Sequence, residues 1–395
     1  MLEASAGPAA LHLELRGPIA APQLEATGRV ADADVTLQAT LRDDALAIDA
    51  AVWSRNDSRL TLRGAISRTA DAPSDVRLTG SAALADLAAL PWLHIPVIDQ
   101  WKLDGTLAVQ VRARGDLRRW TSLQMLGVIR TDALSISGVP LRNASVELEQ
   151  TQEKLSVRLT QASLAGGRLS GRAVLDWQQT PTPYLCELDA IQVDLGQLAA
   201  QLPAWKDKTI DGQASGHVSV LGAWNDAAGA HGDGWLKATG QRLADVPLLN
   251  KFFKNIVLGS LADWIGLSNL RTAQIASISG TFQLRNERVM TDSLTLSGAA
   301  GLEPIAFYVQ GSAGFDKTLD VNVETDLSEQ MLSDAMGKTT LAGRMLKAVG
   351  SLQRMKRLVG RYHIGGTLDK PEPTFEYSFD QTLSRVLQSV FNVLP

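Results

Sequence analysis

The stretch K-L-D-G-T-L-A-V-Q-V-R, residues 102–112, alternates apolar and polar side chains with a period of two. Leu103, Leu107, Val109 and Val111 fall on one side of this alternation, and most of the charged and polar residues fall on the other. Successive side chains of a strand point to opposite faces, so the stretch predicts a β-strand with one apolar and one wet face. Antiparallel sheets tolerate one solvated face, and we therefore expect antiparallel pairing.

The same alternation recurs along most of the chain. It is found at 11–15, 146–148, 155–159, 169–175, 218–220, 282–284, 294–296, 305–309 and 319–327. Turn residues such as Asn56-Asp57 and Gly166-Gly167 separate the predicted strands. Helical patterns between strands are scarce, which argues against a doubly wound α/β sheet. The sequence therefore predicts a mostly β protein built from an antiparallel sheet.

A few segments show helical spacing of their apolar residues instead. A short helical stretch is expected at 84–90, and amphipathic helices are expected at 245–265, 328–359 and 383–394, near the C-terminal end. The 328–359 pattern is interrupted near Gly337 to Gly343.

The segment 338–361 carries basic residues and no acidic ones. Basic amphipathic helices favour anionic lipid surfaces, so Lys347, Arg354, Lys356 and Arg357 are candidates for contact with a membrane surface. The alternative is a solvated helix face that caps the end of the sheet. The sequence leaves both interpretations open.

Composition narrows the classes of function. The 395 residues are 45% hydrophobic and 20% charged, which is typical of a folded chain. The net charge of −4 argues against a general nucleic-acid binder. A single cysteine, Cys186, excludes an intramolecular disulfide framework and a cysteine-rich zinc site, and the five histidines are not spaced like metal ligands. We expect no metal and no cofactor.

Catalytic motifs are also missing from the sequence. Gly337-Lys338-Thr339 resembles the end of a phosphate-binding loop, but Leu332 occupies the position of its first glycine. Neither G-x-S-x-G nor H-E-x-x-H occurs. A β-helix enzyme acting on polysaccharide would need a carboxylate cluster, and acidic pairs such as Asp43-Asp44 fall at predicted turns instead. We therefore expect a protein that is not an enzyme.

No run of about 20 apolar residues is present, so the sequence predicts no membrane-spanning helix. The nearest candidate, residues 81–98, is interrupted by Asp86, Pro91 and Pro96. The first residues also lack a basic segment followed by an apolar run, as a signal peptide would have. Two interpretations follow, a cytosolic protein or a portion of a longer, anchored chain.

Four phrases carry a family resemblance. They are L-R-G-P-I-A-A-P-Q-L-E-A-T-G-R-V (15–30), G-W-L-K-A-T-G-Q-R-L-A-D-V-P-L-L (234–249), I-S-G-T-F-Q-L-R-N-E-R-V-M-T-D-S-L-T-L-S-G (278–298) and H-I-G-G-T-L-D-K-P-E-P-T-F (363–375). Together they resemble the AsmA-like superfamily of bridge-like lipid transport proteins, and the C-terminal portion of its members in particular. The resemblance covers nearly the whole chain, and it is carried by the order and repetition of phrases that are individually weak.

The resemblance implies a long, strongly bent, repetitive antiparallel sheet that forms a hydrophobic groove, a β-taco-like fold. It divides the chain into a repetitive β-groove region, 1–232, and an AsmA-like C-terminal region with amphipathic helices, 233–395. It implies a non-enzymatic lipid conduit that binds phospholipid acyl chains for transport between inner and outer membranes. The place would be the periplasm, with an inner-membrane anchor through an N-terminal helix that this sequence does not contain.

The aliphatic side of the strands is then the expected lipid-binding surface. Its candidate residues are Leu103, Leu107, Val109, Val111, Leu155, Val157, Leu159, Phe282, Leu284, Leu294 and Leu296. The alternative for these side chains is the core of an ordinary β-sandwich. The alternative for the protein is an envelope scaffold or outer-membrane assembly factor whose sheet edges pair with inner- or outer-membrane proteins.

Overall fold

The computed structural model describes residues 2–6, 9–30, 32–69, 72–88, 102–202, 210–224, 226–241, 243, 273–337, 361–368 and 370–375. Most of these residues lie in strands, which confirms the predicted mostly β class. The chain divides into two compact units, Met1–Leu188 and Asp189–Pro395. The division after residue 232, which the family resemblance implies, stays a prediction.

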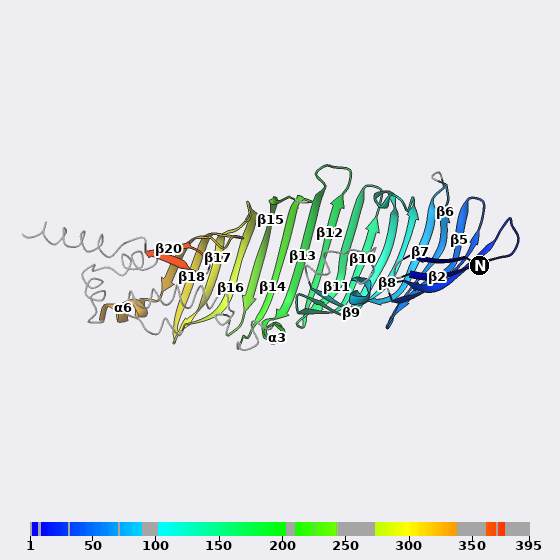
Figure 1. Ribbon diagram of the computed structural model, residues 1–395. Coiled ribbons are helices and arrows are strands. Elements are labelled where there is room, and N and C mark those ends of the chain that lie inside the picture. Colours follow the sequence, from blue (N-terminus) through cyan, green and yellow to red (C-terminus); the bar gives the residue numbers. More distant parts are fainter. Residues whose placement is uncertain are drawn as a thin grey trace, which may run out of the picture. The chain divides into compact units, whose positions relative to one another are not determined.

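The first unit is an antiparallel sheet in which each strand pairs with its neighbour in sequence (Figure 1). Its strands are β1 (Leu2–Ala6), β2 (Ala9–Arg16), β3 (Gln23–Val30), β4 (Ala33–Leu41), β5 (Ala45–Arg55), β6 (Ser58–Ser67), β7 (Ser74–Ala83), β8 (Leu103–Gly115), β9 (Gln124–Ile136), β10 (Val139–Gln150), β11 (Lys154–Leu164) and β12 (Gly167–Asp176). The next strand, β13 (Pro183–Asp194), crosses the boundary between the units.

Two-residue turns join several of these strands, as the turn signals predict. Asn56 adopts a positive φ of 49° in the turn between β5 and β6. The turn between β11 and β12 consists of Ala165 and Gly166, both with positive φ, so it lies one residue earlier than the predicted Gly166-Gly167. Such turns match the right-handed twist of the strands that they join.

Two glycines inside strands are required by close approach of the neighbouring backbone. Gly64 in β6 has a φ of +130°, and a Cβ atom there would lie 2.1 Å from the carbonyl oxygen of Asp75. Gly80 in β7 has a φ of +144°, and its Cβ would lie 2.0 Å from the carbonyl oxygen of Arg59. Glycine within a strand is typical of such close contacts and of local bends.

Helix α1 (Leu84–Ala88) begins where the short helix was predicted, and it packs against β7 and β8. Its Asp86 is only 7% exposed. The carboxylate accepts hydrogen bonds from Ser58 Oγ at 2.6 Å and from Asn56 Nδ2 at 2.7 Å. A buried carboxylate is tolerated when it is hydrogen-bonded, and these bonds tie α1 to the turn before β6. A short 3-10 helix, η1 (Trp120–Ser122), precedes β9.

The second unit is also an antiparallel sheet in which successive strands from β14 onward pair. Its strands are β14 (Gln213–Ala223), β15 (Asp226–Thr239), β16 (Gln274–Arg285), β17 (Arg288–Ala300), β18 (Glu303–Gly314), β19 (Leu319–Leu327), β20 (Arg361–Gly366) and β21 (Pro371–Phe375). Its helices are α3 (Leu195–Gln201) and α6 (Glu329–Gly337). Helix α3 was not expected from the sequence; Asp194 caps it by accepting a hydrogen bond from the Gln197 amide.

A fully buried core fills the second unit. Ile275, Leu296 and Phe307 from β16, β17 and β18 are each 0% exposed, and Met331 of α6 belongs to the same cluster. Ser328 caps α6 by accepting a hydrogen bond from the Met331 amide at 3.2 Å. Helix α6 therefore covers part of this core and confirms the start of the helical region expected from residue 328.

Strand β21 carries prolines at alternate positions. The Thr367 amide donates to the Lys370 carbonyl at 3.0 Å, so the following pair, Gly366 and Pro371, is not hydrogen-bonded, and neither is the pair of Ile364 and Pro373. The nitrogens of both prolines therefore face away from β20. This outer edge of β21 lacks two of the amide donors that an added strand would use.

The other expected helices, at 245–265, 338–359 and 383–394, lie outside the described residues. The candidate membrane-surface residues Lys347, Arg354, Lys356 and Arg357 lie outside them as well. Among the helices that are described, none has the length and apolar character to cross a membrane.

Candidate functional site

One face of the first unit carries apolar residues in register from β2 to β12. Residues directly opposite one another on paired strands share a face of the sheet. The first apolar row consists of Leu13, Ala26, Leu37, Ala51, Leu62, Leu78, Val111, Gly127, Leu148, Val157 and Ala173. No polar side chain interrupts it. At about 4.8 Å per strand the row extends roughly 48 Å along the sheet.

Two further rows flank the first on the same face. The second apolar row consists of Leu11, Gly28, Val35, Trp53, Leu60, Gly80, Val109, Ile129, Val146, Leu159 and Gly171. The third apolar row consists of Leu15, Leu24, Ala39, Ile48, Gly64, Val76, Ala113, Met125, Gln150, Leu155 and Leu175. Only Gln150, which is 2% exposed, is polar.

A bulge in β5 keeps the third row apolar. The register shifts between Ile48 and Ala51, so that Ile48 lies opposite Gly64. Ile48 is buried, whereas its neighbour Asp49 is exposed. A β-bulge inserts an extra residue and re-aims the side chains that follow it. Here it leaves the aspartate off the apolar face.

The large side chains of these rows are only partly buried by the described residues. Leu37, Leu62, Leu78 and Leu148 of the first row are all half-buried, and Leu15 at the end of the third row is 64% exposed. The buried positions of the three rows are Ala26, Ala39, Ile48, Val76 and Gln150. Accessible apolar surface in this arrangement is a feature of binding faces rather than of a closed core.

The sequence-predicted residues of the first unit lie together on this apolar face. Val111 and Val157 belong to the first row, Val109 and Leu159 to the second, and Leu155 to the third. Leu107 pairs with Ala82 and Leu103 with Ile136, on the same side of β8. All seven are half-buried.

The four predicted residues of the second unit lie in two settings. Phe282 and Leu284 in β16 are half-buried. Leu296 in β17 is fully buried within the core, and Leu294 packs against that core. A ligand would have to displace the core to reach Leu296, so the first unit offers the more accessible surface.

Sequence reasoning missed the contribution of β3 to β7. Leu37, Leu62 and Leu78 complete the first row between Leu13 and Val111. The signal was present, since V-T-L-Q-A at 35–39 alternates as clearly as 107–111 does.

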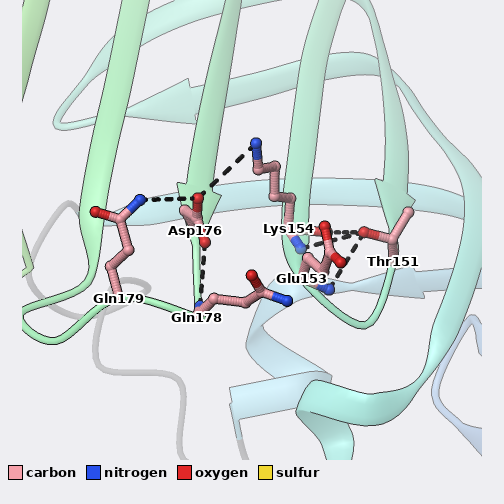
Figure 2. Close-up of polar contacts among 6 residues, drawn as sticks. All are labelled: Thr151, Glu153, Lys154, Asp176, Gln178 and Gln179. Carbon is pink, nitrogen blue, oxygen red and sulfur yellow. Dashed lines mark hydrogen bonds and ion pairs between the residues drawn. The ribbon is translucent and has the colours of Figure 1, made fainter.

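The rim beside the third row is polar. Lys154 lies opposite Asp176 in register, and Lys154 Nζ is 3.8 Å from Asp176 Oδ2 (Figure 2). The same carboxylate accepts hydrogen bonds from the Gln178 amide at 3.1 Å and from Gln179 Nε2 at 3.3 Å. In the neighbouring turn, Thr151 Oγ1 accepts from the Lys154 amide at 3.2 Å. These charged and amide groups lie at the ends of β11 and β12 next to the third row, on the polar side of both strands.

The opposite face of the first unit is polar and carries cross-strand ion pairs. Arg172 in β12 makes two hydrogen bonds to Glu187 in β13, and Arg158 Nη1 lies 3.9 Å from Glu147 Oε2. The Glu187 carboxylate raises the pKa of Arg172 further above its usual value. The sheet thus presents one apolar and one charged face, as the alternation predicts.

No group of histidine, cysteine, aspartate and glutamate side chains within the described ranges could hold a metal ion. In comparisons with known proteins, no family model, no curated protein and no solved structure matches this chain. The AsmA-like resemblance therefore stays a prediction, carried by the sequence phrases alone.

Proposed function

We propose that the apolar face of the first unit binds phospholipid acyl chains, and that the protein is a non-enzymatic lipid conduit. The observation that carries the proposal is the continuity of the first apolar row from Leu13 to Ala173 together with the partial exposure of its leucines. Apolar surface in water costs about 25 cal/mol per Å². An acyl chain lying on the rows removes water from its own surface and from the protein's.

A bent, groove-forming sheet is part of the same proposal. Gly64 and Gly80, whose backbones approach the next strand closely, lie within the third and second rows and allow the sheet to bend there. A groove bent around the apolar face would shield acyl chains on more than one side. Head groups would extend past the third row to the ends of β11 and β12, where Lys154 and Asp176 keep the sheet in contact with water.

The apolar rows are better suited to a lipid that moves along the sheet than to a lipid held at one position. Small-molecule sites hold a ligand with a few well-placed polar groups. The first row contains none and the second only the indole N–H of Trp53, so the first row gives a bound chain no preferred position along the roughly 48 Å from β2 to β12. This uniformity supports transport between the inner and outer membranes, the activity that the AsmA-like resemblance implies, in the periplasm.

The alternative of a scaffold that pairs through its sheet edges gains no support at β21. Pro371 and Pro373 remove amide donors from its outer edge. Binding along the apolar face is therefore the better-supported function.

Site-specific photocrosslinking tests the proposal. A photoreactive residue is placed at Leu107 or Val157 on the apolar face, and at Gln110, which is exposed on the opposite face, as the control. After purification from a diderm bacterium, we expect phospholipid adducts at Leu107 and Val157 and none at Gln110. Absence of adducts at both apolar positions, or equal adducts at Gln110, would contradict acyl-chain binding.

A further inference from the structure

The polar face of the first unit places three arginines directly opposite one another. Arg63 in β6 pairs with Arg77 in β7, which pairs with Arg112 in β8. All three are exposed. Directly opposed residues lie about 5 Å apart at Cβ, and like charges at that spacing destabilise a sheet. Residue choices that lower local stability, such as three like charges in register, are expected mainly at functional sites.

The charge of this arginine row is only partly compensated. Arg112 Nε donates to Asp75 Oδ1 at 2.8 Å, and Arg112 Nη2 donates to Asp75 Oδ2. The hydrogen bonds from Arg112 lower the pKa of Asp75, and the charges of Arg114 and Arg77 add to the effect. Asp75 is thus hydrogen-bonded to Arg112 alone, and it interacts with Arg114 and Arg77 only through their charges.

The other two members of the row have room for an anion. In the part of the chain that the structure describes, neither Arg63 nor Arg77 has a hydrogen-bond or ion-pair partner. Asp49 lies at the β5 bulge, beside the position opposite Arg63, and makes no ion pair with it among those residues. The unmet charge therefore centres on Arg77, between the other two arginines.

A shallow depression of about 420 Å³ adjoins the row on the same face. Arg77 and Arg112 form one side of it, and the other side contains Glu147 and Glu149 of β10 and Arg158 of β11. Leu126 lies between them and is 64% exposed. The depression thus combines a cationic side, an apolar centre and a side of mixed charge, where Arg158 Nη1 lies 3.9 Å from Glu147 Oε2.

We propose that Arg63, Arg77 and Arg112 form a binding site for a phosphate group whose organic substituent lies on Leu126. Guanidinium groups donate pairs of parallel hydrogen bonds to phosphate oxygens, and phosphate offers enough acceptors for neighbouring arginines. Arg158 offsets the charge of Glu147, and Glu149 disfavours a second anion and favours phosphate monoesters whose other end is neutral or cationic. The site lies on the face opposite the apolar rows, so it stands independently of acyl-chain binding.

Calorimetric titration of the full chain with inorganic phosphate, glycerol phosphate and phosphoethanolamine tests the site, with chloride at the same ionic strength as the reference. Arg77→Gln is the test variant. Arg130→Gln is the matched control, because Arg130 is exposed on the same face but lies opposite Ala108 and Ser145. We expect Arg77→Gln to weaken phosphate binding by about tenfold or more, as loss of a charge-assisted hydrogen bond does, and Arg130→Gln to leave it unchanged.

Thermal unfolding supplies a second readout. Phosphate should raise the wild-type midpoint, and it should have no such effect on Arg77→Gln, whose midpoint without phosphate should equal or exceed that of the wild type because a repulsion is removed. Equal losses of binding in Arg77→Gln and Arg130→Gln, or no binding of any phosphate compound, would overturn the site.

Vesicles of phosphatidylethanolamine and phosphatidylglycerol distinguish the sources of the phosphate. Binding of both soluble esters and vesicles that requires Arg77 supports a lipid head group as the ligand. Binding of soluble esters alone supports a free phosphate ester. If vesicles bind but none of the soluble esters does, the binding reflects attraction to a charged surface, and phosphate recognition is refuted.

Discussion

The dependence of affinity on acyl-chain length tests how lipid lies on the apolar face. Full burial of a methylene contributes about 0.8 kcal/mol. The leucines of the first apolar row are half-buried, so a chain lying on them is covered from one side and gains roughly half that value, ~0.4 kcal/mol per methylene. Lengthening the chain by two methylenes should therefore tighten binding by ~0.8 kcal/mol, about fourfold in Kd. If the acyl chain lay in a slot closed on all sides, the same two methylenes would contribute ~1.6 kcal/mol, which is a roughly fifteenfold change in Kd.

Competition against a fluorescent fatty acid measures this slope, with a series of lysophospholipids each two methylenes longer than the last and all below their micelle concentration. Val157→Asp introduces a charge into the first apolar row and should abolish binding. Ser156→Asp is the matched control, since Ser156 is equally half-buried on the same strand but faces the polar side. Affinity that is independent of chain length, or equal losses in the two variants, would refute binding at the apolar rows.

Three further predictions concern the scaffold. Gly80→Ala should lower the free energy of unfolding by about 2 kcal/mol or more, because φ is +144° and the new Cβ would lie 2.0 Å from the Arg59 carbonyl oxygen; an unchanged urea midpoint would contradict this. Asp86→Ala should cost about 3 kcal/mol, since the buried Ser58 hydroxyl and the Asn56 amide lose their acceptor. A loss below 1 kcal/mol in urea unfolding would show that water replaces the carboxylate. Hydrogen bonds from Arg112 lower the folded pKa of Asp75, so its contribution to stability is present above the unfolded pKa of about 3.9 and is lost as pH falls through the folded value. The stability difference between wild type and Asp75→Asn should thus shrink in acid, and a difference that grows on acidification would reverse this assignment.

The sequence correctly predicted the features that depend on local periodicity, namely the strands and their apolar sides. Alternation at 103–111 predicted β8 and the side of it that is apolar, and the structure confirms both. The same pattern cannot tell whether a second layer covers that side. Val109 and Leu296 follow the same rule, yet Val109 is half-buried and Leu296 is enclosed with Phe307. Coverage depends on contacts between distant segments, which periodicity does not encode.

The arginine row was beyond the reach of sequence reasoning for a related reason. Arg63, Arg77 and Arg112 are far apart along the chain, and only strand register makes them neighbours. Register between β7 and β8 is set after a long connection that begins with α1 rather than by a tight turn. A shift by one residue would send these side chains to the other face.

The prolines of β21 also affect how molecules of this protein behave at high concentration. A sheet edge with all its amide donors can recruit the edge of another copy, and a protein made largely of strands is prone to such growth into fibres. Pro371 and Pro373 withhold donors at alternate positions, so copies cannot add at β21 with a complete hydrogen-bond ladder. Replacing both prolines with threonine, which pairs well in strands, should turn this edge into a nucleus for polymerisation that light scattering can follow.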